Sequence, residues 1–329
     1  MSVRNTVKGI QQVMWKDAGV DGDAQRLSQL CWMLFLKILD DQDRSLEITE
    51  DDYKSPIPKR FQWRTWAADP EGITGDELLE FVNSELFPKL KSLPIGGPGD
   101  RRRVVRGVFE DAYNYMKSGQ LMRQVINKIN DINFNNLTER QHFGEIYEQL
   151  LNDLQSAGNA GEFYTPRAVT AFMVERIDPK PGEVLLDPAC GTGGFLSCAI
   201  RHMRTHHVKT VKDARRMEDG LRAVEKKQLP HMLCVTNMLL HNVQDPGFVR
   251  HDNRLLAPTR ATPRRTAWIS CSRTRRSAAW KKTASSRTSP NTSRRGKRPT
   301  SSWRSSCVCC GRAAALPWCC LTAPCSAKA

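Results

Sequence analysis

Apolar residues recur at helical spacing through the first part of the chain. Over Leu27–Ile38 they lie three and four residues apart and form a wide face, as in a helix buried in a protein core. The apolar run Cys31–Leu36 within it is too short to span a bilayer. A second helix is predicted over Val105–Met116, after a loop at 94–99 whose glycines and prolines no regular element would tolerate. The N-terminal part is therefore predicted to be mainly helical.

A third helix is predicted to begin at Thr138. The segment from Thr138 to Gln141 has the capping-box pattern, in which the threonine hydroxyl accepts from a backbone N–H and the glutamine reaches back. An apolar stripe follows, formed by Phe143, Ile146, Tyr147, Leu150, Leu151 and Leu154. The small residues at 156–161 are typical of a linker, so we place the end of a helical domain at residue 157.

After this linker the pattern changes to alternating strands and helices. Thr165 and Pro166 are predicted to be the N-cap and first residue of a helix with apolar positions at Val169, Phe172, Met173 and Ile177. A turn at 179–182 precedes Val184–Leu186, a short apolar run typical of a buried parallel strand. A glycine-rich turn and another helix come next. This order predicts the start of a doubly wound α/β domain.

The glycine-rich turn, Asp187–Gly194, is the main candidate for ligand binding. We predict that a strand ends at Asp187, that the chain turns sharply, and that a helix begins near Gly194. Glycines permit positive φ angles and let a ligand approach the backbone. The N–H groups at a helix start favour a carboxylate or a phosphate. A strand–helix turn with glycines only for tightness is the alternative, because such patterns are weak evidence alone.

Composition divides the chain at about residue 256. Residues 257–329 contain 16 of the 50 Lys and Arg and no Asp or Glu, which leaves 34 basic and 35 acidic residues in 1–256. The net charge of +15 therefore belongs to the tail and does not indicate nucleic-acid binding by the rest. A hydrophobic content of 40% excludes a wholly disordered chain. The absence of a membrane span and of a signal pattern predicts a cytoplasmic protein.

The nine residues from Asp187, Asp-Pro-Ala-Cys-Gly-Thr-Gly-Gly-Phe, resemble the S-adenosylmethionine motif of amino-methylating DNA methyltransferases. With Gly161–Arg167 upstream, after a helical domain, residues 1–256 resemble the modification (M) subunit of type I restriction–modification systems. The resemblance implies an α/β fold with a helical N-terminal domain over 1–157. Residues 158–256 would be the N-terminal part of an incomplete Rossmann-like class I S-adenosylmethionine-dependent methyltransferase domain, followed by a basic, disordered tail at 257–329.

The resemblance also assigns cofactor-binding roles. The family's first cofactor-binding segment, which covers the methionine end, is matched by Glu162, Phe163, Tyr164, Thr165, Pro166 and Arg167. The turn that contacts the methionine moiety is matched by Gly191, Thr192, Gly193 and Gly194, with Asp187 at the strand end. For the two aromatic residues, ordinary packing under a helix is the alternative.

Two further positions complete the implied site. Glu225 matches the acid after the second strand, whose carboxylate accepts from both ribose hydroxyls; the alternative is a solvated charge beside two lysines. More residues separate Glu225 from Gly191 along the chain than in a compact dinucleotide-binding unit. This separation predicts an extended helix or insertion around Thr205–Gly220. Asp252 and Asn253 match the position that faces the adenine ring.

In this family the methyl group passes to the exocyclic N6 of an adenine that has left the helix stack. An Asn-Pro-Pro-aromatic tetrapeptide accepts hydrogen bonds from that amino group, and this chain lacks it. We therefore assign no catalytic residue and no metal, and expect the chain as written to be inactive. The implied partners are DNA, a specificity (S) subunit, a second M subunit and a restriction (R) subunit. The alternatives are a truncated module that binds cofactor or partner without catalysis, and a protein or RNA methyltransferase.

The tail is interpreted as an out-of-frame translation. With suitable codons, Arg273–Ser285 read two bases later gives Asn-Pro-Pro-Phe-Gly-Gly-Met-Glu-Glu-Asp-Gly-Ile. With suitable codons, Leu321–Lys328 read in the same shifted frame gives Pro-Asp-Gly-Thr-Leu-Phe-Gly-Glu. We predict a frameshift between about Asn253 and Trp268, which would remove the fourth and later strands and expose a sheet edge.

Three other interpretations of the tail remain. Its seven cysteines could form a zinc site, but C-x₂-C spacing and nearby histidines are missing. A disulfide framework conflicts with the predicted cytoplasmic location. A basic tail that binds nucleic acid is physically possible, and its binding would be unspecific and sensitive to salt.

Overall fold

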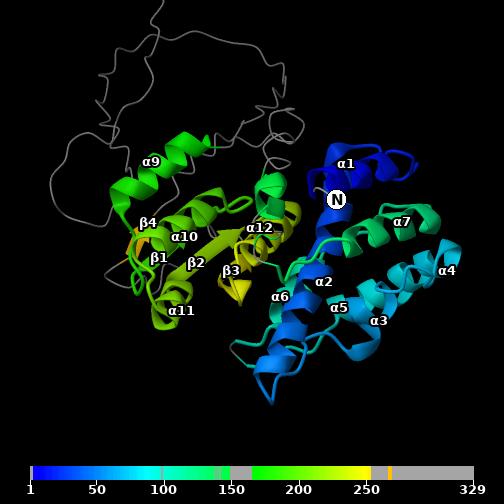
Figure 1. Cartoon of the computed structure of the whole chain (residues 1–329), viewed down its shortest axis with the longest axis horizontal. Coiled ribbons are helices and arrows are strands. Elements are labelled where there is room, and N and C mark those ends of the chain that lie inside the picture. The colour runs from blue at the N-terminus through cyan, green and yellow to red at the C-terminus, as the bar shows by residue number, and fades with distance from the viewer. Residues whose placement is uncertain are drawn as a thin grey trace, which may run out of the picture. The chain divides into compact units, whose positions relative to one another are not determined.

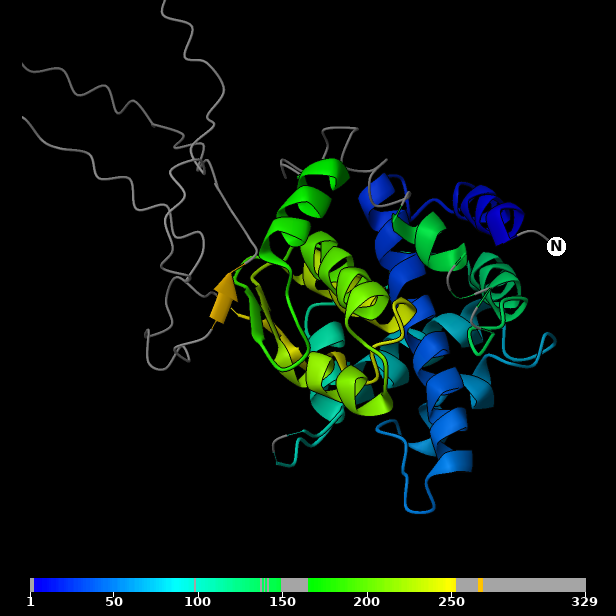
Figure 2. The same cartoon turned by 60° about the vertical axis from the view of Figure 1, so that its left-hand side comes forward.

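The architecture was obtained as a computed structural model, which describes residues 3–97, 99–136, 138, 140, 142–148, 165–252 and 266–268. The chain divides into two units, Met1–Ser270 and Cys271–Ala329, and all described residues belong to the first. Within that unit a set of helices from the N-terminal part lies beside a small parallel sheet and the helices that cover it (Figures 1 and 2).

The long helix α2, Asp23–Thr49, confirms the helix predicted over Leu27–Ile38. Its middle is buried all round, from Leu30 to Leu36, as the wide apolar face predicted. The other N-terminal elements are α1 (Val3–Met14), η1 (Lys59–Phe61), α3 (Trp63–Trp66), α4 (Gly75–Glu80), the π-helix η2 (Phe81–Leu86), α5 (Phe87–Lys91), α6 (Arg102–Phe109) and α7 (Gly119–Asn130). Among the residues that the structure describes, no helix is long and apolar enough to cross a membrane.

Two predicted helix boundaries were wrong. Helix α6 ends at Phe109, so Met116 is buried from a loop and does not continue the helix. Asn136 takes the capping role assigned to Thr138, because its Oδ1 accepts from the Thr138 N–H and its carbonyl accepts from the Arg140 N–H. The start moves two residues back because an asparagine side chain can satisfy the same backbone donors. Gln141 lies outside the described residues.

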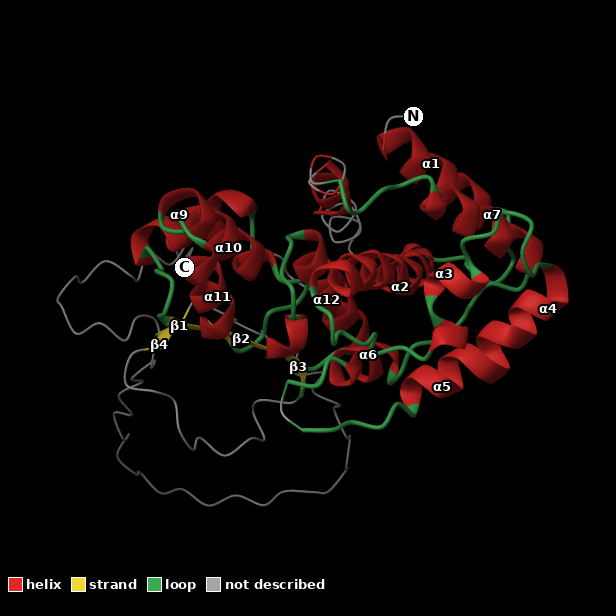
Figure 3. Cartoon of the chain, turned by 60° about the horizontal axis from the view of Figure 1, so that its bottom comes forward, coloured by secondary structure: helices red, strands yellow, loops and turns green. Residues whose placement is uncertain are grey.

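The sheet contains four parallel strands in the order β3-β2-β1-β4: β1 (Val184–Asp187), β2 (Leu221–Glu225), β3 (Val249–His251) and β4 (Thr266–Trp268). The other elements of this part are α9 (Arg167–Ile177), α10 (Gly194–His206), α11 (Val211–Gly220), α12 (Gln228–Leu240) and η3 (Pro246–Phe248) (Figure 3). This order confirms the doubly wound fold, and α11 confirms the predicted insertion. In such folds, ligands bind at the carboxyl strand ends where the strand order reverses, here between β1 and β4.

The expectation that the sheet lacks a fourth strand was wrong. Val184, Leu185 and Leu186 of β1 are in parallel register with Thr266, Ala267 and Trp268. A strand pair is held by backbone hydrogen bonds, which any non-proline sequence can supply, so the basic composition of the tail does not prevent this pairing. The edge of β1 that was expected to be exposed is paired with β4.

Helix α9 differs from its prediction at both the cap and the face. Pro166, with ψ at 143°, is the N-cap itself and not the first helical residue, so Thr165 lies outside the helix. In the predicted stripe Val169 and Phe172 are exposed, and Met173 and Ile177 are only half-buried; the apolar residue that α9 covers fully is Val174, outside the stripe. The apolar pattern predicted the helix but not the orientation of its face.

The two parts of this unit share one hydrophobic core, because α2 packs against α12. Cys31 of α2 is fully buried, and its Sγ lies 3.2 Å from Thr236 Oγ1 and 3.4 Å from Tyr147 Oη. Burial raises the pKa of the Cys31 thiol to about 11, so it stays protonated at neutral pH. The Tyr147 hydroxyl also donates to the carbonyl of Leu233, which joins the segment 142–148 to α12.

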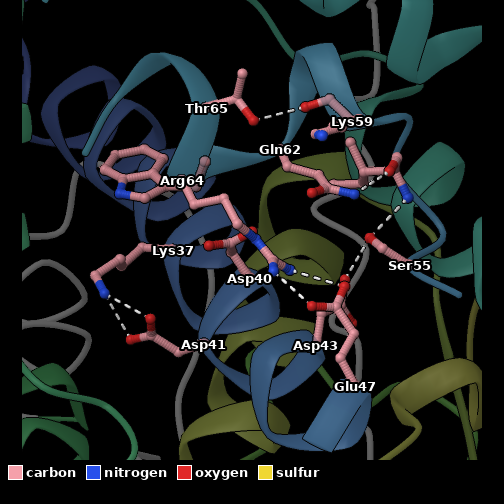
Figure 4. A network of polar contacts seen from close by, with 12 residues as sticks. Lys37, Asp40, Asp41, Asp43, Glu47, Ser55, Lys59, Gln62, Arg64 and Thr65 are labelled. Atoms are coloured by element: carbon pink, nitrogen blue, oxygen red, sulfur yellow. Dashed lines mark hydrogen bonds and ion pairs between the residues drawn. The ribbon is translucent and has the colours of Figure 1, made fainter. Parts of the chain in front are cut away.

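A polar network holds the C-terminal half of α2 to the segment that follows it (Figure 4). Asp43 is 1% exposed and accepts hydrogen bonds from Tyr53 and Ser55, each at 2.5 Å. Arg64 donates from Nε to Asp40 Oδ1 at 2.8 Å and from Nη1 and Nη2 to Glu47. Burial raises the pKa of Asp40, although the Arg64 guanidinium opposes that shift. The buried carboxylates are therefore matched by donors that fix the local fold.

Candidate cofactor site

The candidate site is built on the turn between β1 and α10, and the bounds of this turn are those that the sequence predicted. β1 ends at Asp187, whose Oδ1 accepts from the Ala189 N–H at 3.2 Å, and α10 begins at Gly194. The Cys190 N–H donates to the carbonyl of Val224 at 3.1 Å, which joins the turn to β2. The turn is thus held at the carboxyl end of the sheet, where the fold predicts a ligand.

The three glycines of this turn have different surroundings. Gly191 (φ +54°) and Gly193 (φ +84°) adopt the left-handed region that favours glycine. A Cβ on Gly193 would lie 2.9 Å from Cys234 Sγ, so this residue is packed tightly on α12. A Cβ on Gly191 or Gly194 would meet no atom within 4 Å. The turn therefore rests on α12 on one side and presents bare backbone to open space on the other.

Glu225 lies directly beside this turn, although 34 residues separate it from Gly191. It ends β2, the neighbour of β1, and its Oε2 accepts from the Gly191 N–H at 2.9 Å. Its Oε1 accepts from the backbone N–H groups of Lys226 and Lys227 at 2.9 and 2.8 Å. The parallel register of β1 and β2 thus brings an anchored carboxylate to the open side of the glycine turn.

The start of α10 suits an anion. No side chain caps this 13-residue helix, and its first turn has no acidic residue. The first-turn N–H groups and the helix dipole of such a terminus favour a carboxylate. Below the turn, the hydrogen bond with Cys234 and burial raise the pKa of Cys190, so this thiol is a packing group and not a nucleophile. The turn therefore offers a place for a ligand carboxylate and, at Glu225, an acceptor for hydroxyl groups.

The predicted segment upstream of α9 is described only in part. Glu162, Phe163 and Tyr164 lie outside the described residues, as does the linker at 156–161. Thr165 and Pro166 precede α9, and Arg167 is its first residue. The Arg167 guanidinium forms an ion pair with Glu148, so in this structure it connects α9 to the segment 142–148.

The predicted adenine position lies at the end of β3. The Asp252 N–H donates to the backbone carbonyl of Glu225 at 2.9 Å, and its carboxylate pairs with Arg250 at 2.5 Å. Asp252 also borders a cavity of about 450 Å³ between α6 and β3, whose lining includes His231 and His251. Asn253 lies outside the described residues. The fold thus brings Asp252 next to Glu225.

Several residues that build the site gave no signal in the sequence analysis. Asn237 of α12 donates to the carbonyl of Thr192 at 3.1 Å, and Cys234 and Met238 lie under Gly193. All three face the turn from an almost wholly buried helix, in which they are part of the core. Their spacing of three and four residues places them on one helical face, which is the signal that could have found them.

Two family models match the chain. The model described as "HsdM N-terminal domain" matches residues 3–129, and the model described as "N-6 DNA Methylase" matches residues 138–300. The first covers the helical part, and the second covers the sheet with the glycine turn and Glu225.

The relatives agree with these matches. The EcoEI type I restriction enzyme methylase subunit of Escherichia coli is 62% identical over 260 residues, which is 78% of this chain and 53% of the relative. The StySPI methylase subunit of Salmonella potsdam is 27% identical, over 56% of this chain and 38% of the relative. This chain thus spans about half the length, or less, of these relatives.

A solved structure gives the same comparison at the level of the fold. The crystal structure of a modification subunit assigned to a type I restriction enzyme from Vibrio vulnificus YJ016 is 38% identical, with a TM-score of 0.68. The matched region is 80% of this chain and 58% of that one. It therefore includes most of the helical part and of the sheet described above.

Proposed function

The chain belongs to the family of type I restriction–modification M subunits, and from this premise we propose that it binds S-adenosylmethionine at the turn between β1 and α10. The whole protein of this kind would transfer a methyl group to N6 of adenine in DNA. The observation that carries the proposal is the Glu225 carboxylate, fixed 2.9 Å from the Gly191 N–H beside open glycine backbone.

The residues fit the chemical groups of this cofactor. The uncapped start of α10 would receive its carboxylate, and Gly191 and Gly194 leave room for the methionine chain. Glu225 would accept hydrogen bonds from the ribose hydroxyls, and Asp252 would border the adenine. Asp187, Thr192 and Gly193 would hold the turn in place, and the segment 162–167 would cover the methionine end. The cofactor supplies an electrophilic methyl group on a sulfonium.

Binding of the cofactor is tested by calorimetric titration of the 329-residue chain with S-adenosylmethionine. Glu225→Gln exchanges one carboxylate acceptor for an amide donor and should weaken binding at least about tenfold, as expected for losing a charged hydrogen-bond partner. Glu183→Gln is the matched control, because Glu183 precedes β1 at the opposite end of the parallel sheet and should bind as the unmodified chain does. Equal affinity of the Glu225 variant would contradict the proposed site.

Methyl transfer is a separate question, because the chain lacks the Asn-Pro-Pro-aromatic tetrapeptide. We propose that the chain as written is a cofactor-binding and assembly module, with DNA, an S subunit, a second M subunit and an R subunit as the partners of the whole protein. An assay of methyl transfer to DNA in the presence of the S subunit should give no turnover. Turnover would show that the chain supplies the missing acceptors from other residues.

The frameshift is proposed as the reason for the missing tetrapeptide. The 62% identity to the EcoEI subunit extends over 260 residues, a length that agrees with the position at which the composition changes. The gene is expected to encode Asn-Pro-Pro-Phe in the shifted frame opposite Arg273–Arg276. Sequencing the gene tests this directly, and a gene without that string in any frame would exclude the proposal.

A further inference from the structure

Away from the cofactor turn, the ends of α9 and α10 bring together an acid and three histidines. Asp178 follows α9, His202 and His206 lie on the last turns of α10, and His207 follows it. Asp178 Oδ1 lies 2.9 Å from His202 Nε2 and 2.6 Å from His207 Nε2. One ligand atom from each of these three residues lies within 4.8 Å of the others. This grouping was not part of the expected site.

We propose that Asp178, His202 and His207 bind a divalent transition-metal ion of the zinc class. Imidazole nitrogen and carboxylate oxygen are common ligands of zinc, at about 2.0–2.2 Å from the ion. A tetrahedral site of that size separates its ligand atoms by about 3.3 Å. The observed contacts of 2.9 and 2.6 Å therefore need to open by less than 1 Å to admit the ion.

The electrostatic surroundings support a cation at this place. Both α9 and α10 end here, and the carboxyl end of a helix carries a partial negative charge. Asp178 Oδ1 contacts a ring nitrogen of both His202 and His207, so the carboxylate already faces the place proposed for the ion. Lys180 Nζ lies 3.6 Å from the other carboxylate oxygen, Oδ2, and leaves Oδ1 directed at the histidines.

The cluster is both ordered and accessible. Asp178 adopts a left-handed conformation, with φ at 46° and ψ at 60°, which sets its side chain against α10. The side chains of His202 and His207 are 13% and 24% exposed, whereas that of Asp178 is 45% exposed and provides the route of entry. The fourth position of the ion would be filled by water. The ring of His206 lies at a tilt to that of His202, with centroids 4.7 Å apart, but His206 is outside the three-residue set.

The position of the cluster gives the ion a structural role. Helices α9 and α10 pack on each other, and α10 begins at the cofactor turn, at Gly194. An ion that joins Asp178 to His202 and His207 would fix α9 on α10 at the far end. This role is independent of the proposed cofactor, because no residue of the cluster belongs to the turn.

The test uses the full chain without a histidine tag, treated with a chelator and then titrated with Co²⁺, which reports tetrahedral ligands by visible absorption. His202→Gln and Asp178→Asn should each weaken Co²⁺ binding at least about tenfold, since losing a ligand costs more than losing a hydrogen-bond partner of a ligand. Cobalt bound by cysteines also absorbs in the visible, but it adds a thiolate charge-transfer band in the near ultraviolet; that band should be unchanged in both variants, so the visible absorption that they lose is assigned to the cluster. Circular dichroism verifies that each variant is folded.

Two matched controls make the test specific. His142→Gln removes an exposed histidine elsewhere and should leave the visible band unchanged. His206→Gln removes the neighbouring ring and should reduce the affinity less than His202→Gln does. Adding Zn²⁺ should also raise the melting temperature of the unmodified chain but not of Asp178→Asn. Equal Co²⁺ binding by the unmodified chain and Asp178→Asn, or an equal loss in His206→Gln, would overturn the assignment.

Discussion

At the residue scale, two glycines of one turn have separable roles. A Cβ on Gly193 meets Cys234 Sγ at 2.9 Å and Met238 Cε at 3.1 Å, and its φ is +84°. We expect Gly193→Ala to reduce the free energy of unfolding by about 2–4 kcal/mol, from backbone strain and overpacking together. Gly191→Ala meets open space and should cost only about 1–2 kcal/mol, from its left-handed backbone.

The order of the two variants should be reversed for cofactor binding. The methyl group of Gly191→Ala enters the space proposed for S-adenosylmethionine, so this variant should lose more affinity for the cofactor than Gly193→Ala does, although it loses less stability. Urea unfolding and calorimetric titration of both variants measure the two effects. If Gly191→Ala binds as the unmodified chain does, the open side of the turn is not where the cofactor lies.

His231 predicts a pH dependence of stability. It is 3% exposed, its Nε2 bonds to the carbonyl of Val249 at 3.2 Å, and its Nδ1 has no hydrogen-bond partner among the described residues. Burial lowers the pKa of His231 to about 4. The unfolded chain then binds the proton more readily, so this residue's stabilising contribution is present above pH 6.5 and is lost as the pH falls towards 4. Between pH 7.5 and pH 5 the loss should be about 2 kcal/mol.

The contribution of His231 to the pH dependence of stability is measured by comparing the unmodified chain with His231→Gln. Glutamine keeps a donor for the Val249 carbonyl but cannot be protonated in this range. Urea unfolding at several pH values should therefore give a smaller loss of stability on acidification for the variant. His241, whose pKa burial also lowers to about 4, contributes equally to both proteins and cancels in the difference. Identical pH profiles would exclude His231 as a source of the dependence.

At the element scale, α2 is joined to the α3 region by a partly buried ion pair. Arg64→Met keeps the aliphatic stem but leaves the Asp40 carboxylate, 5% exposed, without its guanidinium partner. We expect a loss of about 3 kcal/mol in the free energy of unfolding, because a buried charge loses its compensation. Arg60→Met is the matched control: its pair with Glu85 is exposed and should contribute less than about 1 kcal/mol.

A double-mutant cycle tests the cause of this loss. In an Asp40→Asn background the buried charge is absent, so Arg64→Met should cost at least about 1 kcal/mol less than in the unmodified chain. Chemical unfolding of the four proteins gives this coupling energy. Additive losses would assign the effect of Arg64 to Glu47 or to packing.

The elements also show which features of the fold the sequence could predict. The strand, turn and helix around Asp187–Gly194 were predicted because glycines and a short apolar run act locally. The placement of Glu225 needed the family resemblance, because its contact with Gly191 depends on the parallel pairing of β1 and β2. The exposed face of α9 was missed because an apolar pattern does not indicate which neighbour covers it. The grouping of Asp178 with His202 was missed because it arises from the packing of two helices.

At the scale of the whole molecule, the sequence suggested a boundary at residue 157 between two domains, whereas Met1–Ser270 is one compact unit. The boundary itself lies outside the described residues. Across it, α2 and α12 share a core in which Cys31 contacts Thr236. Because this packing buries the α2 surface around Cys31, we expect the folding of the helical part to depend on the sheet part.

We therefore expect residues 1–270 to unfold in a single cooperative transition, and residues 1–157 alone to lack one. In the shorter fragment, the α2 surface around Cys31 would lose its cover of Met232, Thr236 and α12 and become exposed to water. Apolar area of this kind contributes about 25 cal/mol per Å² when buried, so its exposure removes a large part of a marginal stability. Calorimetry and near-ultraviolet circular dichroism compare the two fragments, and binding of a hydrophobic dye reports the exposed face. A sharp transition in residues 1–157, with no dye binding, would show instead that the helical part folds by itself and that α12 docks on a finished surface.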